Sequence, residues 1–142
     1  MRIWKKSMSV EEISAGNKNT AASHLGIEFL EVGDDFIRGR VPVDVRTRQP
    51  FGLLHGGVSV MLAETLGSVA AQLCCAEGLL AVGLDINANH LRGVMHGWVT
   101  GTARPIHIGR KTHVWQIDLT NEEGQPTCVS RITVAIVEAQ QS

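Results

Sequence analysis

A single carboxylate, Glu64, lies inside the most apolar stretch of the chain. Apolar side chains recur at three- and four-residue spacing over residues 57–75, which predicts a long helix that is buried on most sides. On this helix Ser68 lies one turn after Glu64, so its hydroxyl is available to orient the carboxylate. A partly desolvated carboxylate has the raised basicity that a catalytic base or nucleophile requires. Glu64 is therefore a candidate catalytic residue, and the alternative is a solvated glutamate on an amphipathic helix.

A second segment that could carry chemistry, QPFGLLHGG at residues 49–57, leads directly into the same helix. Two glycines at a helix start let a ligand approach the free backbone N–H groups, and the helix dipole favours negative charge there. The segment therefore predicts an oxyanion or anion site at the helix start. The alternative is a flexible glycine cap that binds nothing.

The spacing of these two features predicts an assembly of two chains. Gly56 and Glu64 are eight residues apart, which is about 12 Å along a helix axis. One small reacting group cannot readily touch both. If both residues act in one reaction, the helix N-terminus of one subunit must face Glu64 of another, and a symmetric dimer with two equivalent sites is expected.

The rest of the chain predicts a single α+β domain around this helix. The spacing of Ser9 and Glu12 matches a capping box and predicts a short helix that ends at Gly16, and a further helical turn is expected over 20–24. Alternating polarity and turn residues predict six strands, over 26–32, 36–43, 80–90, 96–103, 111–120 and 127–137. The segment 44–55, which Pro50 and Gly52 interrupt, is expected to be a functional loop.

Composition excludes several classes of function. With 13 Lys and Arg against 14 Asp and Glu, the chain has no global positive field for nucleic acid or an anionic membrane. The apolar stretch is interrupted by Glu64 and Gln72, well short of a membrane span, and the basic N-terminus lacks the apolar run of a secretory signal. Three cysteines (Cys74, Cys75 and Cys128) fit neither a disulfide framework nor a zinc set, which indicates a reducing, cytoplasmic setting.

Three segments, QPFGLLHGGVS at 49–59, AETLGS at 63–68 and VGLDINANH at 82–90, resemble the hotdog-fold acyl-CoA thioesterases. The resemblance runs from Ile3 to Val137. It is strongest to the bacterial 1,4-dihydroxy-2-naphthoyl-CoA thioesterases and to the related proofreading thioesterase of enterobactin assembly. It implies a six-stranded antiparallel sheet wrapped around the central helix, homodimers that commonly pair into tetramers, and active sites between subunits.

The resemblance also implies a role for each matching residue. Glu64 would act as the nucleophile or as the general base on water, while the Gly56 N–H polarises the thioester carbonyl. Gln49 and His55 would hold the thioester and the leaving thiolate, and Ser68 would steady Glu64 or its water. Contacts with coenzyme A are implied at Gly83, His90, Leu91, Arg92, Gly93, His107, Ile108, Gly109, Arg110, Lys111 and Thr112.

Two of these assignments compete with simpler interpretations. Strand alternation alone makes His90 a buried core histidine, whereas the resemblance places it beside the acyl or pantetheine channel. Arg92, Arg110 and Lys111 would form a local cationic patch for phosphates, although exposed basic side chains are usually solvated surface.

The expected reaction is hydrolysis of an aromatic or hydroxyaromatic acyl-CoA to the free acid and CoA. No cofactor is expected, because the thiolate leaves readily and water is the co-substrate, and the histidine spacings match no common zinc pattern. An acyl or aryl carrier protein is an alternative thiol carrier, so menaquinone synthesis and siderophore proofreading both stay open. A hotdog dehydratase is a further alternative, which the order of Gln49, His55 and Glu64 disfavours. A non-catalytic acyl-thioester sensor would need an effector segment.

Overall fold

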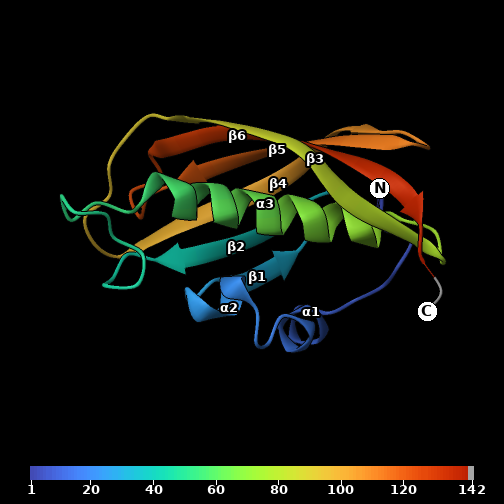
Figure 1. Ribbon diagram of the computed structural model, residues 1–142, viewed down its shortest axis with the longest axis horizontal. Coiled ribbons are helices and arrows are strands. Elements are labelled where there is room, and N and C mark those ends of the chain that lie inside the picture. Colours follow the sequence, from blue (N-terminus) through green and yellow to red (C-terminus); the bar gives the residue numbers. More distant parts are fainter. Residues whose placement is uncertain (141–142) are drawn as a thin grey trace.

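The computed structural model describes residues 1–140 and shows one long helix held in a curved antiparallel sheet (Figure 1). The elements in chain order are α1 (Val10–Gly16), α2 (Ala21–His24), β1 (Glu28–Val32), β2 (Ile37–Pro42), α3 (Gly56–Leu73), β3 (Leu79–His90), β4 (Trp98–Ile108), β5 (Thr112–Thr120) and β6 (Pro126–Glu138). The six strands are ordered β1-β2-β4-β5-β6-β3, and every neighbouring pair is antiparallel. The predicted α+β architecture with six strands and one main helix is confirmed. No helix among the described residues is long and apolar enough to cross a membrane.

The core forms where α3 packs against the concave face of the sheet. Leu66, which is fully buried, fits between two strand glycines. A Cβ at Gly39 would lie 2.7 Å from one methyl of Leu66, and a Cβ at Gly101 would lie 2.9 Å from the other. Larger residues at these positions would push the helix away from the sheet, so the glycines fix the height of α3 above β2 and β4.

The helix is enclosed along most of its surface, but the side chain of Glu64 is not. Its sheet-facing residues Leu62, Leu66 and Ala70 are fully buried, but Glu64 on the other side is exposed. Only Gly57 and Glu64 of α3 are exposed, so the expectation of a helix buried on most sides is confirmed, whereas the expectation that Glu64 is partly desolvated is wrong for a single chain. The physical reason is that the sheet curves around only one side of the helix, and the small α2 covers a limited part of the remainder (Figure 1).

β4 continues five residues beyond the predicted end at Ala103, through Pro105 to Ile108. Its pairing with β2 stops at Ala103, whereas its pairing with β5 continues to Ile108. Pro105 thus lies where one side of β4 has no neighbouring strand, and the register shifts between Pro105 and His107. A proline is tolerated at such an edge because no ladder hydrogen bond is needed from its nitrogen.

β3 forms one edge of the sheet and carries an exposed apolar row. It is twelve residues long, and the exposed fractions of Leu80, Val82 and Leu84 are 42%, 46% and 62%. An edge strand of this length has a free row of backbone donors and acceptors, which makes it a surface suited to pairing with another strand.

The N-terminal segment packs over the end of the sheet near His113. The Trp4 ring stacks on Trp115 with ring centroids 6.1 Å apart, and the Trp4 indole N–H donates to the Gly33 carbonyl. His113 is 2% exposed, and its Nδ1 accepts a hydrogen bond from the Trp115 indole N–H at 3.4 Å. His113 is thus held as a neutral imidazole whose accepting nitrogen is occupied.

Burial lowers the pKa of His113, and the charges of His107 and Lys5 lower it further. The unfolded chain therefore takes up a proton near pH 6.5, before the folded protein does. The stability that neutral His113 contributes is present above this pH and is lost as the pH falls through the lower folded pKa. We predict that the urea midpoint falls between pH 7 and pH 5, and that it falls less in His113→Leu. If the urea midpoint falls equally with pH in the wild type and in His113→Leu, this role of His113 is contradicted.

Candidate functional site

The start of α3 presents one free backbone donor, the N–H of Gly56. His55 is the N-cap residue, and its Nδ1 accepts the Gly57 N–H at 2.8 Å. This bond leaves the proton of neutral His55 on Nε2, which is free to donate. Within residues 1–140 the Gly56 N–H has no hydrogen-bond partner. It can therefore bind an oxygen that carries developing negative charge.

Gln49 is oriented by the loop that precedes the helix. Its side-chain oxygen accepts the backbone N–H groups of Phe51 and Leu53, and the backbone N–H of Gln49 donates to the Leu53 carbonyl at 2.8 Å. Because the amide oxygen faces two donors, the amide nitrogen is left to donate to a ligand. The predicted functional loop is thus a tight turn that fixes one donor beside Gly56.

Gln49 and Gly56 line a cavity of about 340 Å³, whereas His55 is not among its lining residues. Six of the predicted site residues meet in it: Gln49, Gly56, His90, Leu91, Arg92 and Gly93. His90 approaches the helix start so closely that a Cβ at Gly56 would lie 3.2 Å from its Nε2. His90 is exposed, so the alternative of a buried core histidine is wrong.

Thr127 also lines this cavity and has no counterpart among the predicted residues. Its carbonyl accepts the N–H groups of Leu91 and Arg92, at 2.8 and 3.4 Å, and so positions the loop after β3. Its hydroxyl is buried and has no hydrogen-bond partner among residues 1–140. Threonine has no local sequence signature for this role, and only the pairing of β3 with β6, which sets His90 opposite Cys128, brings it to the cavity.

The thiol of Cys128 does not have the properties of a nucleophile. It is 1% exposed. Burial raises its pKa, and the charge of Asp118 raises it further. A thiol rather than a thiolate is therefore present at neutral pH.

Metal-ligand clusters are a separate matter. No group of three or more His, Cys, Asp and Glu in the described part of the chain is arranged to hold a metal ion.

Glu64 lines a different cavity, of about 430 Å³, which lies between α2 and the exposed side of α3. Gly83 on β3 approaches it, since a Cβ there would lie 3.3 Å from Glu64 Oε2. No hydrogen bond joins Ser68 to Glu64 within the described residues, so the predicted role of Ser68 stays a prediction. The carboxylate and the Gly56 N–H thus belong to separate cavities of one chain.

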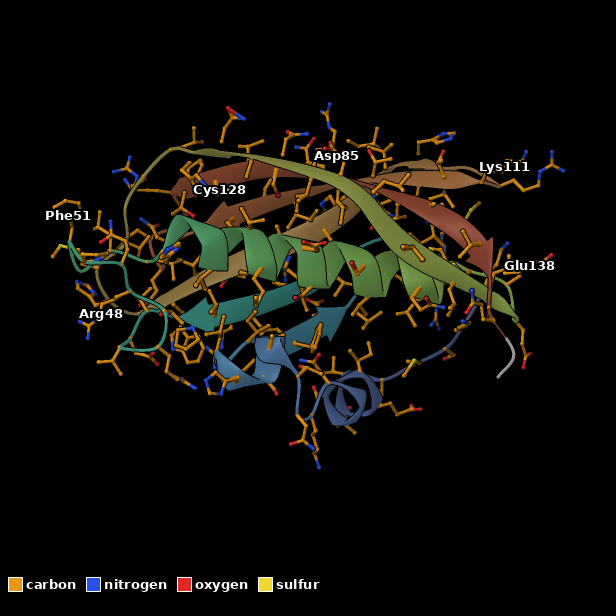
Figure 2. All side chains as sticks on the ribbon, in the orientation of Figure 1. Arg48, Phe51, Asp85, Lys111, Cys128 and Glu138 are labelled. Atoms are coloured by element: carbon orange, nitrogen blue, oxygen red, sulfur yellow. The ribbon has the colours of Figure 1, made fainter. Side chains whose placement is uncertain are left out.

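The remaining predicted residues lie at the hairpin of β4 and β5: His107 and Ile108 end β4, Gly109, Arg110 and Lys111 form the turn, and Thr112 begins β5. In Figure 2, Lys111 lies at one end of the molecule, and Arg48 and Phe51 lie at the other. Cys128 lies toward the end that holds Arg48 and Phe51, and Cys128 is the strand partner of His90. Arg92 therefore lies far from Arg110 and Lys111 within one chain. The expected single cationic patch is split, because β4 and β5 carry their connecting turn away from the start of α3.

The chain is similar to known proteins over most of its length. The thioesterase superfamily model matches residues 51–128. A 1,4-dihydroxy-2-naphthoyl-CoA hydrolase of Escherichia coli is 47% identical over 135 residues, which cover 95% of this chain and 99% of the relative. A proofreading thioesterase, EntH of Cronobacter turicensis, is 46% identical over 135 residues, with 95% and 98% covered. The crystal structure of a thioesterase from Haemophilus influenzae matches with a TM-score of 0.95 and 53% identity, and covers 98% of this chain and 97% of that one.

Proposed function

Because the chain belongs to the thioesterase superfamily and is a thioester hydrolase of the hotdog fold, we propose that it hydrolyses an aromatic or hydroxyaromatic acyl-CoA to the free acid and coenzyme A. The substrate class is that of 1,4-dihydroxy-2-naphthoyl-CoA, after the relative at 47% identity. Since the relatives are thioester hydrolases, the alternatives of a dehydratase and of a non-catalytic sensor are set aside. The observation that supports the proposed site best is the free Gly56 N–H, which is held beside Gln49 and His90 in one cavity.

The site is completed when two copies pair. Gly83 lies beside Glu64, and His90 lies beside Gly56, at two points along the same edge strand. Antiparallel pairing of two β3 edges can set Gly83 of one copy across from His90 of the other, at a strand spacing of about 4.8 Å. In this register Glu64 of one copy lies near the Gly56 N–H of the other. The same pairing covers the exposed side of Glu64 and supplies the desolvation that one chain lacks.

A two-fold axis generates two equivalent sites from this pairing. The apolar side chains of Leu80, Val82 and Val137 stay outside the paired segment and line a further hollow on the sheet. They support a second interface, so a dimer of dimers is proposed as the full assembly.

Hydrolysis then follows from the donors and the carboxylate. The thioester oxygen accepts the Gly56 N–H, which stabilises the charge that develops on it. Glu64 either attacks the carbonyl carbon to form an anhydride, which water then hydrolyses to the free acid and the Glu64 carboxylate, or takes a proton from the water that attacks and passes it to the leaving thiolate. The carbon–sulfur bond breaks, and the thiolate is stabilised by the donors of Gln49 and His55. Arg92, which lines the Gly56 cavity, remains a proposed phosphate contact of coenzyme A, and Arg110 and Lys111 would have to reach the phosphates from another copy of the chain.

A second candidate substrate is an aryl thioester on a carrier protein. The observation that favours it is the 46% identity to a proofreading thioesterase. Coenzyme A and carrier proteins both present the thiol on phosphopantetheine, so the same donors would hold either thioester.

Thiol release from four thioesters tests the proposed function. The panel contains benzoyl-CoA, hydroxynaphthoyl-CoA, decanoyl-CoA and an aroyl carrier protein. We expect the highest kcat/KM with hydroxynaphthoyl-CoA. A preference for the carrier protein would select the second candidate, and a preference for decanoyl-CoA would contradict the aromatic assignment.

A further inference from the structure

The cavity that contains Glu64 is bounded by a segment outside the residues assigned to the site. Asn17, Thr20 and Ala21, from the end of α1 and the start of α2, form one wall. Val60 and Met61 on α3 form the opposite wall beside Glu64. Figure 1 shows α2 next to the first half of α3, on the side away from β3. A volume of about 430 Å³ therefore opens directly from the carboxylate.

We propose that this cavity receives the acyl group of the thioester, and that Ala21 and Asn17 determine which acyl groups bind. This assignment rests on the hydrolase function proposed above. The reacting carbonyl carbon carries the sulfur of coenzyme A on one side and the acyl group on the other. In the paired assembly, Glu64 of one copy reaches this carbon while the thiol arm of the substrate follows the Gly56 cavity of the other copy. The acyl group must then extend into the cavity between Glu64 and α2.

The lining of the cavity fits an aromatic ring that carries a hydroxyl or oxo substituent. Val60, Met61 and the methyl group of Ala21 supply apolar surface, and a methionine adapts its shape to a flat ring. Asn17 adds one polar group. Its side-chain oxygen lies 3.2 Å from the Thr20 hydroxyl, whereas its side-chain nitrogen has no hydrogen-bond partner within the described residues. This nitrogen is free to donate to an oxygen on the acyl group.

The Thr20 hydroxyl is already used within the wall. It donates to the Asn17 carbonyl at 2.7 Å and accepts the Ser23 N–H at 3.3 Å. These bonds hold the turn between α1 and α2 in place, so Asn17 and Ala21 are fixed at the cavity before a ligand binds. A preformed wall of this kind discriminates by shape as well as by hydrogen bonding.

Ala21→Leu tests the shape of the cavity. Ala21 is exposed and lies at the start of α2, where leucine is compatible with the helix. We expect the affinity for a non-hydrolysable naphthoyl-CoA thioether, measured by calorimetry, to fall about tenfold, while the affinity for the acetyl-CoA thioether stays within about twofold. Ala15→Leu is the matched control, because Ala15 is an exposed alanine of α1 that lines no part of this cavity.

Asn17→Ala tests the polar contact. We expect it to lower the ratio of affinities for hydroxynaphthoyl and naphthoyl thioethers about fivefold, because only the hydroxylated ring loses a hydrogen bond. Equal loss for large and small acyl groups in Ala21→Leu, or an unchanged ratio in Asn17→Ala, would overturn the assignment of the cavity. Since these are binding measurements, failure of wild-type turnover would count against the hydrolase function alone.

Discussion

Glu64→Gln lowers kcat for thioester hydrolysis by on the order of a thousandfold or more, with a small change in KM. Glutamine keeps the size of the side chain but can neither attack the thioester carbonyl nor accept a proton from water at neutral pH. Stopped-flow and steady-state thiol release on hydroxynaphthoyl-CoA measure both constants. The substitution should leave the fold intact, because Glu64 is exposed and has no side-chain hydrogen bond among the described residues.

Glu77→Gln is the matched control for this variant. Glu77 is also exposed, but it lies in the turn after α3 and lines neither the Gly56 cavity nor the Glu64 cavity. It should keep the wild-type kcat. A Glu64→Gln protein that retains wild-type turnover would show that another group activates water, and the proposed chemistry would then be wrong.

The double variant Asn87→Glu/Asn89→Glu breaks the pairing of two β3 edges, which leaves at most the smaller assembly held by the second interface, and lowers kcat/KM by about a hundredfold or more. Both asparagines are exposed on β3, two and four residues after Asp85. Two added carboxylates in each copy would face the same charges of the other copy across the paired strands, and like charges at that distance destabilise pairing. Sedimentation velocity reports the assembly, and thiol release reports the site.

The control places two added carboxylates near β1, which is the opposite edge strand of the sheet from β3. Ser14→Glu/Ala15→Glu adds two carboxylates to α1, which contacts β1 rather than β3. This variant should keep the wild-type assembly and activity. A β3 variant that has lost the pairing of β3 edges yet stays fully active would contradict a site shared between two chains.

Local patterns predicted the elements that depend on neighbouring residues. The capping box at Ser9 is present, with the Ser9 hydroxyl accepting the Glu12 N–H at 3.1 Å and the Glu12 carboxylate accepting the Ser9 N–H at 3.2 Å. The helix predicted over 57–75 is observed over 56–73. Such features need only contacts within a turn or two, so sequence spacing is sufficient to predict them.

Features that depend on strand pairing could not be predicted in the same way. The extension of β4 through Pro105 follows from where β2 ends, and the exposure of Glu64 follows from how far the sheet curves around α3. The resemblance places Gln49 and His55 with Gly56, and the structure sets Gln49 and Gly56 in one cavity together with His90 but without His55. Thr127 was missed because it reaches that cavity only through the register of β3 with β6.

The central claim is that Glu64 of one chain acts with Gln49 and Gly56 of another. Subunit exchange between two inactive variants, Glu64→Gln and Gln49→Ala, tests it most directly. Each mixed dimer would contain one site with an intact Glu64 from one chain and an intact Gln49 from the other. Random exchange at equal concentrations should therefore restore about a quarter of the wild-type rate of thiol release, since half of the dimers are mixed and each has one working site of two. A mixture that exchanges subunits, as shown by mass spectrometry, yet stays inactive would place Glu64 and Gln49 in the same chain's site and contradict the claim.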